Sequence, residues 1–361
     1  MMLYNSHVNQ PESNQEASVD LDILRKPVSR AEVVEYVKSL AVPWLSRYYS
    51  RGYIALAICL ILASLVWLVW ALAGSSISGV LGATSLGVVG VYVLVVAWST
   101  RSRYVKEIKL RRFAESNNLL YVPQVENAKK SGMIFNVVAT STSSDMIQST
   151  PGSRIQFEMG RLRYVVGSGK NRSVSCWRYL VVKIDRHVPH AVLDSTKNNL
   201  QLFGMNLLSN LPVTVKDGQE LALEGDFNKY FKLFVPVGYE RDALYIFTPD
   251  LMALLIDNAN DFDAEMVDDQ LYFYQREDAF DAKKIWSEDY YTKVFDIVNN
   301  IGQKIKNNTD YYSDERVGDR ALNVVAPEGR RLKTGVTKLV VFMAVIYIIY
   351  YAIKIYLELS R

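Results

Sequence analysis

The sequence predicts an α+β cytosolic domain with a mainly antiparallel sheet, anchored by three transmembrane α-helices that form an N-terminal hairpin and a C-terminal span. Three apolar runs, at residues 54–73, 79–98 and about 339–357, carry no charge at their centres. A bilayer core about 30 Å thick is crossed by about twenty such residues in a helix. The polar region between the second and third runs changes from a period of two to a period of 3.6, which indicates strands followed by helices.

The charges that flank these runs predict their orientation. The turn at residues 74–78 carries no charge, whereas the other flanks are basic. Positive residues stay on the cytoplasmic side, so we expect the N-terminus and central domain in the cytoplasm, and the C-terminus outside, at a bacterial inner membrane. The basic flanks comprise Arg47, Arg51, Arg101, Arg103, Lys106, Lys109, Arg111, Arg112, Arg330, Arg331, Lys333 and Lys338.

The N-terminal part is divided into a tail and a helix. Residues 1–28 are mostly polar and are expected to form a disordered tail. Residues 29–50 are expected to form an amphipathic juxtamembrane helix, because Ser29 and Glu32 have the spacing of a capping box. Its apolar stripe, which includes Val33 and Val37, leaves two alternatives open: the helix lies on the membrane surface, or it packs on the soluble domain.

Two membrane segments complete the anchor. In the hairpin, residues 51–100, the small residues Gly79, Ala83 and Gly87 recur every four positions, so this face is expected to pack on the first span. The C-terminal span, residues 335–361, carries a polar stripe on an apolar rod. We expect the tyrosines of this stripe to form hydrogen bonds between helices and its lysine to reach the outer interface, rather than line an ion path. The stripe comprises Tyr347, Tyr350, Tyr351 and Lys354.

The first half of the central domain, residues 101–306, is expected to be a stalk and a sheet. Residues 104–116 have a pattern that continues the second span as a rigid helix. The stretch at 139–153 is rich in Ser and Thr and ends in Pro-Gly, so it is expected to be an exposed loop. Strands are predicted at residues 155–159, 162–166 and 175–184.

The second half adds short strands and helices. Thr248, Pro249 and Asp250 predict the start of a helix that runs to about Asp257. Further elements follow from the same patterns: strands at 221–223, 232–235 and 245–247, a hairpin at 264–274 that turns at Asp268 and Asp269, a helix at 279–306, and a polar linker at 307–334.

A glycine-rich stretch raises the question of a phosphate site. Gly167, Ser168, Gly169 and Lys170 could in principle cradle an anion. A phosphate loop needs the spacing GxxxxGK[ST] between a strand and a helix, and here Asn171 follows the lysine. A hairpin turn between two strands is the favoured interpretation.

Two histidines and an acidic stretch are the remaining candidates. His187 and His190 could bind a metal or act as acid and base, but a structural or surface role is favoured because no further ligands stand at metal-site spacing. The acidic stretch lacks the spacing of a calcium-binding loop, so a solvated loop and hairpin tip is favoured. It comprises Asp257, Asp261, Asp263, Glu265, Asp268 and Asp269.

Three phrases carry a resemblance. They are RHVPHAVLDS at residues 186–195, LEGDFNKYF at 223–231 and TPDLM at 248–252. The stretch from about 183 to 274 resembles a family of uncharacterised bacterial membrane proteins. The resemblance implies a cytosolic α+β domain tethered by membrane helices, and it implies no catalytic residue.

The sequence as a whole favours a non-enzymatic function. No catalytic, cofactor-binding or metal site is predicted, and a net charge of +3 is too mild to indicate nucleic-acid binding. We expect a membrane-anchored interaction or scaffold protein whose partners are the lipid bilayer and a protein, or a second copy of the chain. The alternatives are a membrane-tethered enzyme of unfamiliar type, with the histidines or acidic residues as its centre, and an accessory subunit of a transporter or channel.

Overall fold

A computed structural model describes residues 19–40, 51–74, 76–202, 205–277, 287–319, 321–335 and 347–351. Residues 1–18 of the expected disordered tail therefore lie outside the described residues, as does most of the third span. For residues 19–28 the expectation was wrong, because Asp22–Leu24 form a 3-10 turn and Leu21, Ile23 and Leu24 pack against the core. Of that span, residues 347–351 form one helical turn, in which the rings of Tyr347 and Tyr351 lie 4.7 Å apart between centroids.

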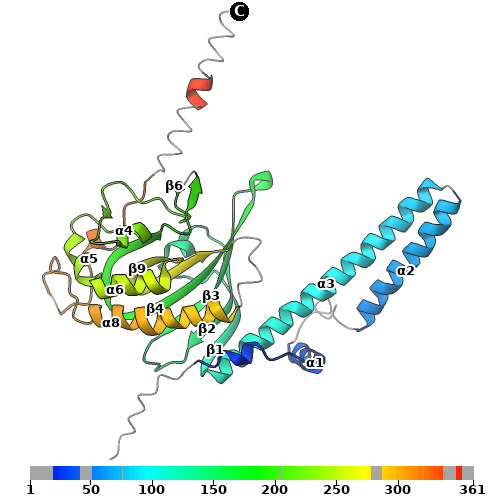
Figure 1. Ribbon diagram of the computed structural model, residues 1–361, viewed down its shortest axis with the longest axis horizontal. Coiled ribbons are helices and arrows are strands. Elements are labelled where there is room, and N and C mark those ends of the chain that lie inside the picture. Colours follow the sequence, from blue (N-terminus) through cyan, green and yellow to red (C-terminus); the bar gives the residue numbers. More distant parts are fainter. Residues whose placement is uncertain are drawn as a thin grey trace, which may run out of the picture.

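The described chain contains both helices and strands (Figure 1). The helices are α1 (Arg30–Ser39), α2 (Arg51–Ala73), α3 (Ile77–Ser116), α4 (Phe227–Tyr230), α5 (Glu240–Ile246), α6 (Pro249–Ala259), α7 (Glu288–Asp296) and α8 (Gln303–Thr309), with a π-helical turn, Ile297–Gly302, between the last two. The strands are β1 (Leu119–Glu126), β2 (Ser141–Ser149), β3 (Phe157–Val166), β4 (Ser173–Ser195), β5 (Leu200–Leu202), β6 (Met205–Leu208), β7 (Glu220–Leu221), β8 (Phe231–Phe234) and β9 (Asp263–Arg276).

The main sheet is built around the long strand β4. Its order is β1-β2-β3-β4-β8-β7, and β9 pairs with the other side of β4. Every pairing in it is antiparallel. β5 and β6 form a separate two-stranded hairpin. The predicted α+β domain with an antiparallel sheet is confirmed.

The two faces of the sheet are covered differently. Side chains of β4 alternate, so Leu180 and Val182 face the helices while Tyr179 and Val181 face the other way. Helices α6 and α8 lie across the first face (Figure 1). Residues 127–140, here called the cover segment, lie against part of the second face through Ile134 and its neighbours. Among the described residues, no helix covers the rest of the second face.

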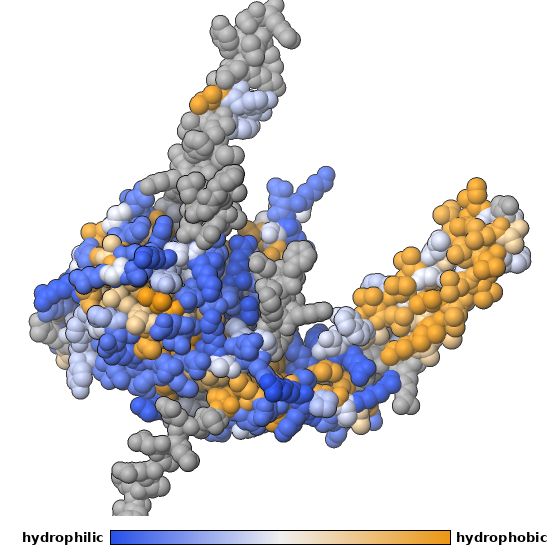
Figure 2. All heavy atoms as spheres, viewed as in Figure 1, coloured by the Kyte–Doolittle hydropathy of each residue, from blue (hydrophilic) through white to orange (hydrophobic). Residues whose placement is uncertain are grey.

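Helices α2 and α3 form an apolar hairpin. Both are long and apolar enough to cross a membrane, by length and composition, and only 17% of the most apolar window of each is buried. Large side chains such as Trp70, which is 74% exposed, point outward all along it. The hairpin is therefore an apolar rod that projects away from the polar domain (Figure 2). An apolar surface of this size indicates association with a membrane.

Small residues hold this hairpin together, as predicted. A Cβ placed at Gly87 would lie 2.8 Å from the hydroxyl of Ser64, and one at Gly90 would lie 2.7 Å from Ile61. Ala83 is buried on the same face of α3. Close approach of two backbones maximises dispersion contacts where lipid offers no hydrophobic driving force.

The second half of α3 is a stalk that enters the domain. The helix is continuous from Ile77 to Ser116, which confirms the predicted extension. Near its end, Phe113 joins the main core, where its ring lies 6.0 Å from that of Phe295. The apolar hairpin and the domain are thus connected by one unbroken helix.

Helix α1 packs on this stalk. The predicted capping box is present, with Ser29 and Glu32 exchanging side-chain and backbone hydrogen bonds. Its buried residues Val33 and Val37 contact Tyr104 and Ile108 of α3. Of the two alternatives for this helix, the described structure therefore favours packing on protein; residues 41–50 lie outside it.

Two predictions about strands were wrong. The expected loop at 139–153 contains β2, in which Ser143 and Ile147 are fully buried, because this stretch pairs on both sides with β1 and β3. The expected hairpin at Asp268 is a single strand, β9, because β4 offers it a partner along its whole length. Asp268 has a φ of 57°, which marks a bulge in the pairing rather than a turn.

Three further boundaries also differ. Residues 157–166 form one strand, not two. Residues 245–247, expected as a strand, lie at the end of α5, where Ala243 and Ile246 are buried at helical spacing. Of the long helix expected at 279–306, residues 279–286 lie outside the described part, and a π-helical turn interrupts the remainder.

The predicted polar linker is part of the domain. Residues 310–319 and 321–335, here called the C-terminal strap, follow α8 and contribute Tyr312 and Val325 to the core. The carboxylate of Asp314 accepts hydrogen bonds from the Tyr239 hydroxyl at 2.7 Å and from the Ala326 backbone at 2.9 Å. The strap is therefore a fixed element and not a free tether.

Candidate functional site

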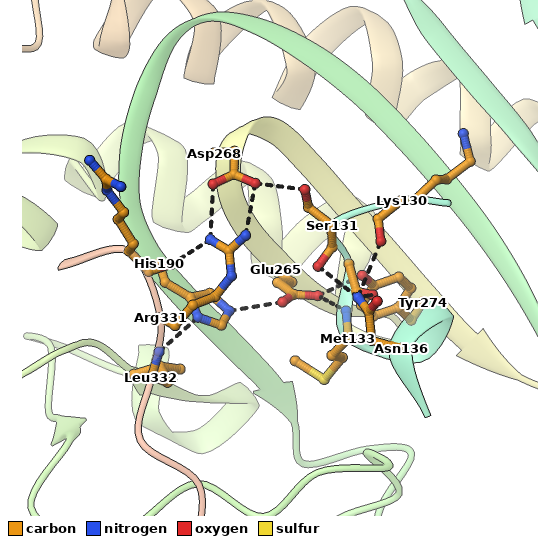
Figure 3. Close-up of polar contacts among 12 residues, drawn as sticks. Lys130, Ser131, Met133, Asn136, His190, Glu265, Asp268, Tyr274, Arg331 and Leu332 are labelled. Atoms are coloured by element: carbon orange, nitrogen blue, oxygen red, sulfur yellow. Dashed lines mark hydrogen bonds and ion pairs between the residues drawn. The ribbon is translucent and has the colours of Figure 1, made fainter. Parts of the chain in front are cut away.

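Glu265 lies at the centre of a buried polar cluster on β9. It stands on β9 and is buried. Its carboxylate accepts hydrogen bonds from the Met133 backbone at 2.7 Å and from the Tyr274 hydroxyl at 2.6 Å, and it bonds His190 at 2.8 Å (Figure 3). Burial raises the pKa of the Tyr274 hydroxyl well above its usual range, and the Glu265 charge adds to this effect. Tyr274 is therefore a neutral donor.

His190 links this carboxylate to the C-terminal strap. Its Nδ1 accepts a hydrogen bond from the Leu332 backbone at 2.9 Å, while its Nε2 faces Glu265. Because Nδ1 accepts, the proton of the neutral ring is on Nε2, which donates to Glu265. Both ring nitrogens are thus used in structural contacts.

Asp268 makes the second half of the cluster. Its carboxylate accepts two hydrogen bonds from Arg331, each 2.9 Å long, and one from the Ser131 hydroxyl at 2.6 Å. These bonds to Arg331 lower the pKa of the Asp268 carboxyl. The left-handed backbone at Asp268 turns this side chain toward the strap (Figure 3).

The cluster holds two chain segments against β9. Met133 and Ser131 belong to the cover segment, whereas Arg331 and Leu332 belong to the strap. Asn136 closes the cover segment on itself by donating to the backbone carbonyls of Lys130 and Gly132. The arrangement is a two-sided clamp made by β9 together with His190 of β4.

His190 and Glu265 are both enclosed by protein. The Glu265 carboxylate lies on the face of β9 that carries Tyr274, and its side chain is only 1% exposed. Within the described ranges, no three His, Cys, Asp or Glu side chains converge as metal ligands. A substrate would have to displace the strap to reach His190.

The structure separates the two histidines that the sequence placed together. His187 contacts the strap through its backbone N–H, which donates a hydrogen bond to Asn323 at 2.8 Å. Its ring Nδ1 is buried. His190 alone enters the clamp. His190 therefore has the structural role that the sequence favoured. Its partner Glu265 was not predicted.

The acidic stretch does not act as a unit, and its interpretation as a solvated loop was wrong. Glu265 and Asp263 are buried in β9, Asp261 pairs with Lys293 at 2.6 Å, and Asp257 is exposed on α6. Alternation along a strand sends neighbouring side chains to opposite faces. Of these residues, Glu265 and Asp268 enter the clamp, whereas Asp257, Asp261 and Asp263 lie elsewhere.

Asp263 forms a separate buried site near the β5–β6 hairpin. It accepts hydrogen bonds from the Ser195 backbone at 2.9 Å and from the Asn198 amide at 3.0 Å. Burial, together with the nearby charge of Asp194, raises the pKa of Asp263 to about 8. Asp194 is held by Asn199 at 3.0 Å, and burial raises its pKa too.

An open groove lies on the sheet face that the helices leave free. Its volume is about 340 Å³. Glu158 stands on its floor, where it bonds Lys130 at 2.8 Å and Tyr179 at 2.7 Å. The walls mix polar and apolar side chains, which suits a peptide or protein surface better than a small apolar ligand. They include Leu120, Gln148, Gln156, Val181, Lys183 and Gln270.

Sequence reasoning missed this groove. Its residues come from five strands, the loop between β2 and β3 and the cover segment, so they are scattered over 150 positions of the chain. The available signal was the presence of Glu158 and Lys183 at strand positions whose neighbours along the same face, such as Tyr179 and Val181, are buried.

The glycine-rich stretch is a hairpin turn, as predicted. It connects β3 to β4, and Gly167 and Gly169 have φ values of 80° and 56°. A strand follows it where a phosphate loop would require a helix.

Comparisons with known proteins add little. No protein-family model and no curated protein matches the sequence. Among solved structures, the crystal structure of the mycobacterial trehalose monomycolate transport factor A, TtfA, matches with a TM-score of 0.35 and 7% identity, over 56% of this chain and 93% of that one. A similarity of this size carries no argument about fold or function.

Proposed function

We propose that this chain is a membrane-anchored interaction protein whose α+β domain binds another protein beside the bilayer. One observation carries the proposal: the side chains most capable of chemistry, His190, Glu265 and Asp268, are all engaged in holding chain segments. The groove beside Lys130 remains open. The domain is thus organised to present a surface.

The anchoring supports the same function. Because α3 runs from the apolar hairpin directly into the core, the groove is held at a fixed height from the bilayer. We further propose that residues 335–361 form a third span, and that the domain lies on the cytoplasmic side of a bacterial inner membrane. The basic flank after the second span supports this orientation.

Photocrosslinking from the groove in living cells tests the proposal. A photoreactive residue at Gln148 or Gln156, on the walls of the groove, should give a discrete adduct with a partner protein or with a second copy of the chain. The same residue at Glu224, an exposed position near the opposite sheet edge, serves as the control. Lys130→Glu should weaken the groove adducts, because it replaces the ion pair between Lys130 and Glu158 with two carboxylates that repel each other.

An enzymatic function would give a different pattern. Equal adducts at Glu224 and in the groove would count against a specific binding surface. Turnover of a substrate by the purified full chain, abolished by His190→Gln, would replace the proposal with the tethered-enzyme alternative.

A further inference from the structure

The hairpin formed by β3 and β4 has a basic and exposed tip. Between positions 161 and 178 the chain has five basic residues and no Asp or Glu. Arg161 is neutralised by Glu277 at 2.6 Å, but Arg163, Lys170 and Arg172 are exposed. The tip therefore presents positive charge, and none of these three side chains forms an ion pair with a residue in the described ranges.

This tip extends beyond the rest of the sheet. On one side, β2 pairs with β3 only as far as Tyr164, and on the other β9 pairs with β4 only as far as Trp177. The ladder of β3 with β4 continues to Val166 and Ser173. Val166 and the nearby Val174 are 42% and 48% exposed, so the basic tip also carries apolar side chains.

The hairpin and the membrane helix run in the same direction. Far from the membrane, Phe113 of α3 and Phe157 of β3 both pack on the ring of Phe295, with ring centroids 6.0 and 5.7 Å from its own. At the next level toward the membrane, Lys106 of α3 contacts Asp145 of β2, which lies beside Arg161 of β3. Figure 1 shows the β3–β4 hairpin rising on the side of the domain from which α2 and α3 project.

The two elements reach similar heights. From Lys106 to the end of the apolar run at Trp98 is eight residues of helix, roughly 12 Å. From Arg161 to Val166 is five residues of strand, roughly 17 Å before the turn is added. The basic tip therefore lies at about the level where α3 enters the bilayer.

We propose that the tip of the β3–β4 hairpin is a second membrane contact, which binds the headgroups of anionic phospholipids in the bilayer that holds α2 and α3. Lys170 and Arg172 provide the charge attraction, and Val166 and Val174 face the acyl boundary. The inference rests on the membrane anchoring proposed above. Tethering by α3 raises the local concentration of lipid over that of any soluble polyanion, which favours lipid as the partner.

The test uses the full-length protein in vesicles of equal parts phosphatidylcholine and phosphatidylglycerol. Ser168→Cys, in a background of Cys59→Ala and Cys176→Ser, carries an environment-sensitive fluorophore, and a nitroxide on lipid headgroups quenches it. Arg154→Cys is the matched control, because it is exposed near the opposite end of β3. Strong quenching is expected at position 168 and weak quenching at position 154.

Charge dependence completes the test. Lys170→Glu with Arg172→Glu should lower the ratio of lipid-bound to free tips by roughly fivefold or more per residue, and high salt or pure phosphatidylcholine should act likewise. Quenching at position 168 that equals the control, or that ignores these changes, overturns the inference. If the fluorescence at position 168 changes only when cell extract is added, the tip binds a protein, and this result also overturns the inference.

Failure of the anchoring itself has a separate signature. All variants should float with the vesicles, because α2 and α3 are unchanged. Protein that does not float refutes the membrane anchoring, whereas floating protein with an unquenched tip refutes only the lipid contact.

Discussion

The ammonium of Lys106 lies 2.6 Å from the carboxylate of Asp145, which is 96% buried at the side chain, and this pair joins the stalk of α3 to strand β2. Asp145 has a φ of 54° at the irregularity where β2 shifts its pairing with β3. The bulge thus directs a carboxylate out of the sheet toward the helix. This contact fixes the orientation of the domain relative to α3.

Removing the lysine should destabilise the junction. Lys106→Met leaves the buried Asp145 charge without its partner, and we expect a loss of about 2 kcal/mol in the free energy of unfolding, because Lys106 itself keeps some exposure. Thermal unfolding in mild detergent, followed by tryptophan fluorescence, measures it. Lys129→Met, at an exposed position, is the control. Adding Asp145→Leu to Lys106→Met should recover part of the loss, and no recovery would contradict the pairing.

The clamp on β9 predicts a cost for a single hydroxyl. Tyr274→Phe removes a donor from the buried Glu265 carboxylate and should destabilise the domain by about 1.5–3 kcal/mol, as expected for a hydrogen bond to a charged group. The same unfolding measurement checks this. Tyr311→Phe, at an 88% exposed position, should change nothing. Equal stability of both variants would show that Glu265 does not depend on Tyr274.

Asp263 predicts a pH dependence with a definite sign. Its pKa is about 8 in the folded chain and near the ordinary 3.8 when unfolded, so the folded state holds the proton more tightly. This contribution is complete below about pH 4 and is lost as the pH rises to about 8. The wild type should therefore lose stability over this window relative to Asp263→Asn. Asp269→Asn, on the same strand, should follow the wild type, and parallel curves for all three proteins would refute the raised pKa.

The C-terminal strap predicts an effect of one methyl group. A Cβ at Gly329 would overlap the ring of Tyr239, so Gly329→Ala should push the strap away from the domain. Trypsin should then cleave after Arg330 and Arg331 faster than in the wild type. Gly318→Ala is matched, because nothing lies within 4 Å of its added Cβ. If the two variants are cleaved at the same rate, the strap is not held as described.

Local patterns predicted the elements that local physics determines. The capping box at Ser29, the small-residue face around Gly87 and the turn at Gly167 each depend on a few neighbouring residues, and each is present. The extension of α3 followed from the continuous helical pattern of its apolar and basic residues. These features need no information about distant parts of the chain.

The missed features depend on tertiary partners. β2 is a strand because β1 and β3 flank it, despite a composition typical of a loop. Asp268 continues a strand because β4 extends past it. The clamp joins residues 131, 190, 265 and 331, which no local pattern connects. The strap looked like a linker because its few buried side chains, such as Tyr312 and Val325, are widely spaced.

Resistance of the full-length chain to extraction from membranes tests the central claim most directly. The hairpin of α2 and α3 exposes an apolar surface that water cannot solvate favourably, so the protein should remain with the membrane pellet after alkaline carbonate washing and should need detergent to dissolve. Recovery of the folded full-length protein in the soluble fraction without detergent would contradict the account.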